Sequence, residues 1–228
     1  MAEPAGDVLQ GDLGHQVQVQ LGPDADQGLA QQVGALLDRM LHQIVGRAVV
    51  DEVRHRLYVT NITPPQILAF DTDTGALVGS RSIASSPTTV EVNDVTGNVY
   101  VADTFNHTIR KIAPGGEVTT LAGKAGAAGS ADGKGAAARF NGPAALWLDA
   151  DNNLLVADRD NHMIRKITPS GVVTTLGGVP NCMSCADGFG KEALFAQPSG
   201  ITSGDDGILY VADACNNRVA GISHIQNP

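Results

Sequence analysis

The chain has 228 residues, of which 43% are hydrophobic and 17% charged, so its composition is that of a globular protein and not of a disordered one. Its net charge of −9 argues against partners with a phosphate backbone or an acidic lipid surface. Its 3 cysteines are too few for a disulfide framework in a chain of this length.

The N-terminal part of the chain lacks the marks of a targeting segment. Residues 1–14 contain no positively charged region and no apolar run, so we expect no secretory signal. Charged side chains interrupt the most apolar stretch, residues 35–50, which is therefore not expected to span a membrane. We predict a soluble, cytoplasmic protein without a membrane partner.

Residues 1–46 differ from the rest of the chain and form a predicted N-terminal extension. Gln and Val alternate in residues 15–21, which is the pattern of a half-buried β-strand. Residues 26–46 carry leucine and other apolar residues at helical spacing, which predicts an amphipathic helix. The remainder, residues 47–228, is predicted to be a separate repeat domain.

From residue 47 onward the sequence repeats itself. The triplet Val-Ala-Asp ends at Asp103, Asp158 and Asp213, in steps of 55 residues (158 − 103 and 213 − 158). A less regular copy precedes these, with Asn61 in the position of the aspartate. Each unit contains short apolar or β-branched runs separated by turns such as "TPSG", which predicts four short antiparallel strands and no helix. Four-stranded units at this spacing are typical of β-propeller blades.

The segments "YVADTFNHTIRKI" and "LVADRDNHMIRKI", together with the loop "SADGKGAAARFNGP", resemble the NHL repeat. The resemblance implies an all-β fold, a partial or small β-propeller of about four NHL-type blades. The third residue of the Asn-His-Leu signature differs here, because Thr108 and Met163 follow the two Asn-His pairs. The last unit has Asn216 and Asn217 in place of Asn-His.

One aspartate and one asparagine recur in each of the three clear units. An aspartate at the end of a strand can accept hydrogen bonds from backbone N–H groups two or three residues on, and asparagine adopts a left-handed conformation at low cost. A residue needed in every blade is expected to build the blade, so we assign these positions a structural role. They are Asp103, Asp158, Asp213, Asn106, Asn161 and Asn216. His107 and His162 recur in the same way and are expected to be packed, hydrogen-bonded rings.

In a four-stranded blade, the connection between the second and third strands lies at the same end as the connection to the next blade. The turns after the aspartates therefore share a face with the long loops 124–139 and 179–194, and loops on a rigid scaffold are where binding sites usually occur. We predict a non-catalytic scaffold that binds a protein partner through this face. The candidate binding residues are Phe105, His107, Arg159, His162, Asp132 and Asp187.

A propeller enzyme is a first alternative. NHL-type amidating lyases hold zinc with histidines near the central channel, but the segments expected there, "GPAAL" and "QPSGI", contain no histidine or carboxylate. The alternative is therefore a metal-dependent lyase or hydrolase whose site is incomplete in this chain, and no cofactor is expected. Cys182 and Cys185 form a C-x-x-C pair, which is a weak metal candidate because structural zinc uses four ligands.

RNA binding is a second alternative. A dibasic pair occurs at equivalent strand positions in two units, at residues 110–111 and 165–166, and would form a basic stripe. Solvent-facing or interblade charge explains the same residues. The stripe is missing from the first and last units and the chain is acidic, so a nucleic acid partner is not favoured.

The last unit is incomplete. Its strands end near Ile222, and no counterpart of "VVTTLGG" follows. The third strand is therefore expected to have an unpaired edge, which is a site of self-association. Residues 15–21 are the spare strand, and we expect them to pair with this edge or with the edge of another copy of the chain.

Overall fold

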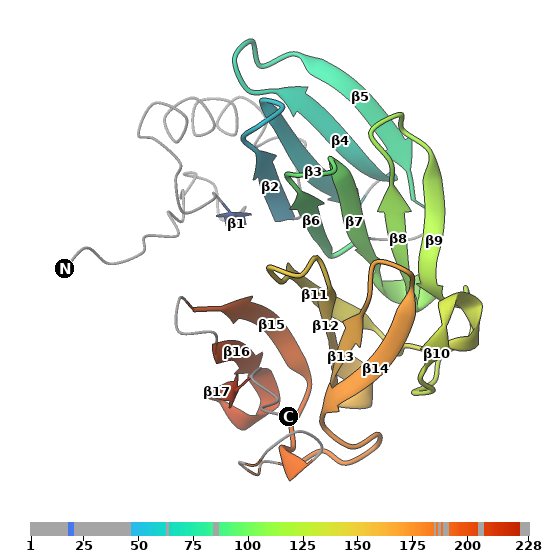
Figure 1. Cartoon of the computed structure of the whole chain (residues 1–228), viewed down its shortest axis with the longest axis vertical. Helices are drawn as coiled ribbons and strands as arrows, with labels where there is room; N and C mark the ends of the chain where they lie inside the picture. Colours follow the sequence, from blue (N-terminus) through green and yellow to red (C-terminus); the bar gives the residue numbers. More distant parts are fainter. Residues whose placement is uncertain are drawn as a thin grey trace, which may run out of the picture. The chain divides into compact units, whose positions relative to one another are not determined.

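The described part of the chain is built from β-strands joined by turns and short 3-10 helices, as Figure 1 shows for the computed structural model. The structure describes residues 18–20, 47–62, 64–83, 87–184, 186, 188, 192–204 and 208–223. The chain divides into two compact units, residues 1–100 with 112–118 (unit 1) and residues 101–111 with 119–228 (unit 2). No helix in the described residues has the length and apolarity needed to cross a membrane.

The strands form four sheets. The first has the order β1-β2-β3-β4-β5, with bounds Gln18–Gln20, Arg47–Asp51, Arg56–Ile62, Pro65–Asp71 and Leu77–Ser82. The second has the order β6-β7-β8-β9, with bounds Thr89–Asn93, Asn98–Asp103, Thr108–Ile112 and Val118–Gly123.

The third sheet has the order β10-β14-β13-β12-β11, in which β10 to β14 span Gly133–Lys134, Pro143–Leu148, Leu154–Asp158, Met163–Ile167 and Val172–Gly177. The fourth has the order β15-β16-β17, with bounds Pro198–Ser203, Ile208–Asp213 and Arg218–Ser223. Both sheets are antiparallel throughout.

The sheets confirm the predicted all-β fold and its period. Strands β11 and β15 begin at Pro143 and Pro198, and β12 and β16 end at Asp158 and Asp213, so both pairs keep the 55-residue step. The last sheet has three strands among the described residues where the second has four. β17 therefore has a single strand neighbour in the described part of the chain, as the missing "VVTTLGG" counterpart predicted.

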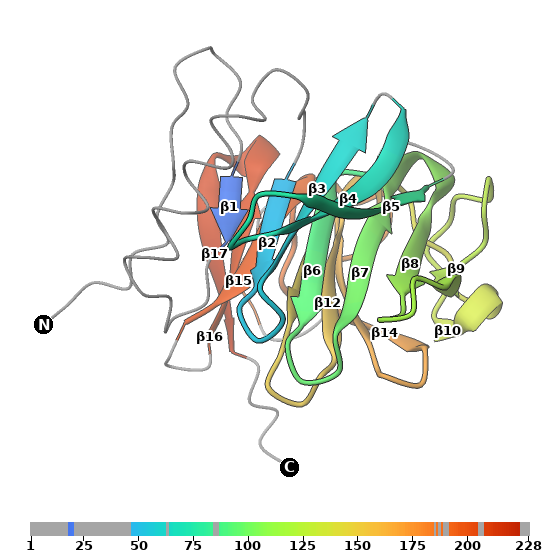
Figure 2. The ribbon, with the colours of Figure 1, turned by 90° about the horizontal axis from the view of Figure 1, so that it is seen from above.

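The N-terminal strand lies elsewhere than predicted. Residues Gln18–Gln20 form β1, which lies beside β2 (Figure 2). The two strands pair in parallel, with Gln18 opposite Arg47. In the described residues the predicted pairing with the edge of the last sheet is therefore wrong, and pairing with another copy of the chain stays a prediction. The predicted helix in residues 26–46 lies outside the described residues, and the boundary between extension and repeat domain stays a prediction.

Burial falls from the second strand of a sheet to its outer strand. Every residue of β12 is buried, whereas β14 is partly exposed and β5 is almost wholly exposed. A strand buried on both faces reads as a continuous apolar run rather than an alternation. This explains the uniform "LLVAD" of β12 beside the polar "LVGSRS" of β5.

The core of unit 2 joins the third and fourth sheets. Phe195 is fully buried in a cluster with Leu155 and Ile164 of the third sheet and with Leu209 and Val211 of the fourth. The ring comes from the segment that leads into β15, so the connection between the sheets is itself part of the core. The chain entering each sheet is therefore fixed by apolar packing.

We predict that Phe195→Ala lowers the free energy of unfolding by about 3–5 kcal/mol, because it leaves a cavity between two sheets. Val179→Ala is the matched control, since this side chain is 41% exposed. It is expected to change the free energy of unfolding by less than about 0.5 kcal/mol. Urea denaturation measures both. A loss below about 1 kcal/mol for Phe195→Ala would contradict the packing role.

Candidate functional site

The candidate face is built from three copies of one turn. β7, β12 and β16 each end at the repeated aspartate and continue into a 3-10 turn, η1 (Thr104–Asn106), η3 (Arg159–Asn161) or η5 (Ala214–Asn216). The residue after each turn is left-handed, with φ values of 57° at His107, 60° at His162 and 51° at Asn217. The left-handed residue is thus one position later than predicted. Its N–H closes the turn, while the asparagine side chain is used for another contact.

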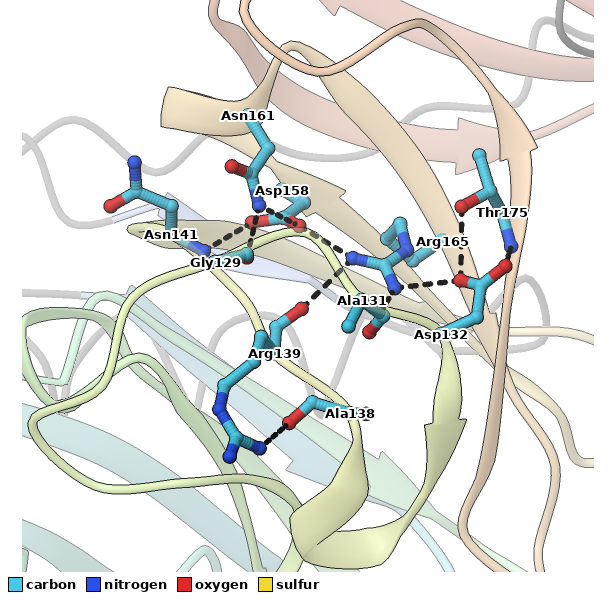
Figure 3. Close-up of polar contacts among 10 residues, drawn as sticks. All are labelled: Gly129, Ala131, Asp132, Ala138, Arg139, Asn141, Asp158, Asn161, Arg165 and Thr175. Atoms are coloured by element: carbon cyan, nitrogen blue, oxygen red, sulfur yellow. Dashed lines mark hydrogen bonds and ion pairs between the residues drawn. The ribbon is translucent and has the colours of Figure 1, made fainter.

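In each turn the asparagine side chain donates a hydrogen bond to the repeated aspartate. Fully buried Asp158 accepts hydrogen bonds from the backbone N–H of Asn141 at 2.8 Å and from Nδ2 of Asn161 at 2.7 Å. A third comes from Nη1 of Arg165 at 2.9 Å (Figure 3). The donors predicted from the sequence were backbone N–H groups two or three residues on. The structure instead ties this carboxylate to the start of its own sheet and to the neighbouring strand.

Arg165 is the largest fully buried side chain of the described residues. Besides Asp158, its guanidinium donates to the backbone carbonyls of Arg139 at 3.0 Å and Ala131 at 2.9 Å, and to Oδ1 of Asp132 at 2.7 Å. Of the two interpretations of this position, solvent-facing or interblade charge, the solvent-facing one is therefore wrong. Arg165 holds the loop before β11 against β13 (Figure 3).

Aromatic packing completes the surroundings of this arginine. The guanidinium carbon lies 5.3 Å from the ring centroid of Phe140, within the range of a cation–π contact. Nε of Arg165 has no hydrogen-bond partner among the described residues. The ring of Phe140 is fully buried and takes the place that water would otherwise occupy beside the cation.

The loop residue Asp132 serves as an anchor. Its carboxylate accepts hydrogen bonds from the backbone N–H of Thr175 at 3.2 Å and from the Thr175 hydroxyl at 3.0 Å, as well as from Arg165. Partial burial acts to raise the pKa of Asp132, but the hydrogen bonds from Arg165 and Thr175 outweigh it and lower the pKa. A second loop contact runs from Nδ2 of Asn161 to the carbonyl of Gly129 at 2.6 Å.

The same cluster recurs in the last sheet with a different arginine. Asp213 accepts from the backbone N–H of Ala196 at 2.6 Å, from Asn216 at 2.7 Å and from Nε of Arg218 at 2.8 Å. Arg218 also donates to the carbonyl of Leu194 at 3.0 Å, and 194 − 139 gives the same 55-residue step as the partner of Arg165.

The last sheet therefore reaches the same contacts from another sequence position. Arg165 follows its aspartate by seven residues and Arg218 follows its aspartate by five. Positions two apart on a strand face the same way, so both arginines reach the carboxylate although Ala220 stands at the position equivalent to Arg165. The side chain of Arg218 is 25% exposed, whereas that of Arg165 is fully buried.

The two recurring histidines connect one repeat to the next. Nδ1 of His107 accepts the backbone N–H of Gly142, and Nδ1 of His162 accepts that of Gln197, both at 3.1 Å. This geometry requires a neutral imidazole that carries its proton on Nε2. The Nδ1 atoms are thus used inside the repeat and are not available to a partner or a metal.

The structure leaves few of the predicted binding residues free. The side chain of Phe105 is 67% exposed at the tip of η1, and the guanidinium of Arg159 is paired with Asp160 at 2.8 Å. Asp187 and Cys185 lie outside the described residues, and the thiol of Cys182 is free. Within the described residues, no group of three or more His, Cys, Asp or Glu side chains is arranged to hold a metal ion.

Sequence reasoning missed other exposed apolar side chains in the loop before β15. Met183 is 60% exposed and Val179 is 41% exposed. The loop is tied to the neighbouring turn, because Nδ2 of Asn216 donates to the carbonyl of Ser184 at 2.9 Å. The only signal in the sequence was the presence of apolar residues in an otherwise small and polar loop.

Comparison with known proteins identifies the repeat. The family model described as NHL repeat matches residues 195–222. NHL repeat-containing protein 2 of Bos taurus is 34% identical over 131 residues, which cover 53% of this chain and 18% of that protein. The chain therefore contains NHL repeats, as the sequence indicated. Teneurin-3 of Danio rerio is 26% identical to this NHL-repeat chain over 162 residues, 62% of the chain and 6% of that protein.

A solved structure supports the same fold. A Bacteroides thetaiotaomicron protein of unknown function superposes with a TM-score of 0.66 at 25% identity, covering 77% of this chain and 46% of that one. The chain thus has an all-β fold of the propeller type, in which four sheets of the described residues correspond to the predicted blades. It spans less than half the length of each of these three proteins.

We predict that Asp158→Ala lowers the free energy of unfolding by about 3 kcal/mol or more, because it orphans three donors, one of them a buried guanidinium. Asp213→Ala is the matched comparison and is expected to cost about 1–3 kcal/mol, since partly exposed Arg218 can be hydrated instead. Urea denaturation measures both values. An equal loss, or a larger loss for Asp213→Ala, would contradict the role of the buried arginine.

The pKa of Asp158 gives a second prediction. Burial raises the pKa of this carboxyl to about 6, against the opposing hydrogen bonds from Asn141, Asn161 and Arg165. The value in the unfolded chain is about 3.9, so between about pH 4 and pH 6 the folded protein binds more protons at this group. Its contribution to the free energy of unfolding therefore falls as the pH rises through this window.

Asp158→Asn cannot titrate and serves as the reference. The free energy of unfolding of the wild type minus that of Asp158→Asn is expected to decrease from pH 4 to pH 6 and to stay level above pH 7. Denaturation at a series of pH values measures this difference. A difference that increases with pH would show that Arg165 lowers the pKa of the carboxyl instead.

Proposed function

We propose that this chain is a non-catalytic NHL-repeat module that binds a protein partner through the loop face of unit 2. The loop face comprises residues 104–107, 124–139, 159–162, 179–184 and 214–217. The observation that carries the proposal is Phe105, a phenylalanine that is 67% exposed on a turn whose backbone is held on both sides. Buried, rigidly placed aromatic side chains are frequent anchors of protein interfaces.

The backbone around Phe105 is well supported. The carbonyl of Asn106 accepts the N–H of Gly126 at 3.2 Å, and the Thr104 hydroxyl donates to the carbonyl of Pro143 at 2.8 Å. His107 accepts the N–H of Gly142 directly after the turn. A partner that covers the ring therefore loses little conformational entropy of this turn on binding.

Phe105 has no equivalent in the other repeats. The 55-residue step places Asp160 and Cys215 at the same position of their turns, and both make polar contacts there. A phenylalanine at this position is not required by the repeat itself. Exposure of this apolar ring to water is unfavourable, and a partner that covers the ring would remove the cost. The exposure therefore favours a binding role.

The charge of the chain indicates the chemistry of the partner. The net charge is −9, so electrostatic complementarity favours a basic protein surface around the apolar anchor. A nucleic acid is disfavoured by the same charge and by the burial of Arg165, which removes a member of the basic stripe. The equivalent Arg110 is partly buried, and its Nη1 donates to Thr120 at 2.7 Å.

The enzyme alternative has less support in unit 2. The inner strands β11 and β15 begin with Pro143, Ala144, Pro198 and Ser199, which supply no general base or metal ligand. The ionisable residues that recur at the strand ends are the repeated aspartates and histidines. They take part in the hydrogen bonds that hold the loops. These contacts support a binding module over a catalyst.

Phe105→Ala is predicted to weaken binding of the partner by tenfold or more, which corresponds to about 1.4 kcal/mol or more. Val95→Ala is the control, because Val95 is 84% exposed on a turn of unit 1, outside the loop face. Immobilised wild-type chain first captures a partner, and the dissociation constants of the purified partner are then measured with both variants.

Three results would contradict the proposal. The first is unchanged affinity for Phe105→Ala, and the second is equal weakening by Val95→Ala. The third is binding of single-stranded RNA with the steep salt dependence of phosphate contacts, which would favour the RNA alternative. Zinc retained by the purified chain in stoichiometric amount would favour the enzyme alternative.

A further inference from the structure

Unit 1 contains a cavity that the proposed function does not use. Its volume is about 220 Å³, and it is lined by residues of β3, β4, β5 and β7 and of the turn between β8 and β9. The volume is below the 300–1,000 Å³ of roughly drug-sized ligand pockets. The cavity therefore suits a small organic molecule rather than a peptide segment.

The floor of the cavity is apolar and belongs to the core of unit 1. It is formed by Ile67 of β4, Val99 of β7 and Ile112 of β8, all of which are buried. Core side chains of this kind are held in place by their neighbours, so the floor is formed before a ligand arrives. A ligand with a compact hydrocarbon body would remove the remaining apolar surface from water.

A fixed arginine forms part of the wall. Nε of Arg81 donates to the carbonyl of Gly116 and Nη1 to that of Ser80, both at 2.7 Å. Gly116 has a φ of 85°, and a Cβ at this position would collide with Nη2 of Arg81, so glycine is what allows the guanidinium to lie over the turn. Arg81 has no carboxylate partner among the described residues, and its Nη2 group donates no hydrogen bond there.

Tyr58 adds a neutral donor to the same cavity. Its hydroxyl makes no hydrogen bond within the described part of the chain. Burial raises the pKa of Tyr58, and the charge of Asp51 adds to this effect, so the hydroxyl stays protonated at neutral pH. The other arginine of the wall, Arg56, is paired with Asp71 at 2.6 Å, so the uncompensated positive charge comes from Arg81.

We propose that this cavity binds a small organic carboxylate with a compact apolar body. The carboxylate accepts hydrogen bonds from Arg81 and from the Tyr58 hydroxyl, and the body packs on Ile67, Val99 and Ile112. An anion is favoured because the guanidinium is already fixed and lacks a counter-charge, so little ordering is required on binding. This site lies in unit 1 and is independent of the loop face.

Gly79 offers a variant that fills the cavity. A Cβ built at Gly79, which lines the cavity on β5, meets no atom within 4 Å, and its φ is not left-handed. Gly79→Leu therefore occupies the space without a backbone clash. Arg81→Gln tests the charge while keeping a planar polar group.

The test is isothermal titration of the full chain with 3-phenylpropionate, and with its neutral amide as the matched probe. The wild type is expected to bind the acid at least tenfold more tightly than the amide. Gly79→Leu is expected to lose binding of both probes by tenfold or more, with an unchanged melting temperature. Arg81→Gln is expected to bind acid and amide equally.

Val53→Ala is the control variant, since this exposed side chain of unit 1 is not among the residues that line the cavity. It is expected to bind the acid like the wild type. Equal binding of acid and amide by the wild type, or binding that Gly79→Leu leaves unchanged, would overturn the proposal. The absence of any heat at millimolar probe would overturn it as well.

Discussion

A fully buried arginine and a fully buried aspartate hold the loop before the third sheet in place. Burying both charges costs free energy, and the cost is offset only when each polar group finds a partner of good geometry. The two Nη groups of Arg165 meet this requirement with two carboxylates and two backbone carbonyls, and Nε, which has no hydrogen-bond partner among the described residues, lies in the same buried cluster. The loop therefore has to present the carbonyls of Ala131 and Arg139 inward, which leaves its other atoms to form the surface. The loop face is a consequence of this constraint.

The last sheet shows that a guanidinium has to reach the repeated aspartate, whereas the sequence position of the arginine can differ. Arg218 reaches Asp213 from the start of β17, and the strand period of two keeps its side chain on the same face as Arg165. The turns after the three repeated aspartates can then vary. Phe105, Asp160 and Cys215 occupy one equivalent position on backbones of the same form. A turn backbone that recurs in each repeat, with a different side chain at its tip, allows a repeat scaffold to carry a binding surface.

The strands were predictable because their burial and turns recur with the 55-residue period, so that Pro143 and Pro198 mark equivalent strand starts. The roles of the charged residues were not. Arg165 is adjacent to Lys166 in the sequence and its partners lie up to 34 residues away, at Ala131, so no local pattern indicates that it is buried. The cavity beside Arg81 was missed for a similar reason, since its walls come from strands that are distant in the sequence.

The central claim is that Arg165 orders the loop before β11. Hydrogen–deuterium exchange of folded Arg165→Met tests it directly. The amides of Gly129 and Arg139, which donate to carbonyls within this loop, are predicted to lose protection, while the amide of Leu194 in the loop before β15 keeps its protection. Unchanged protection of Gly129 and Arg139 in the folded variant would show that the loop is ordered without the arginine and would contradict the claim.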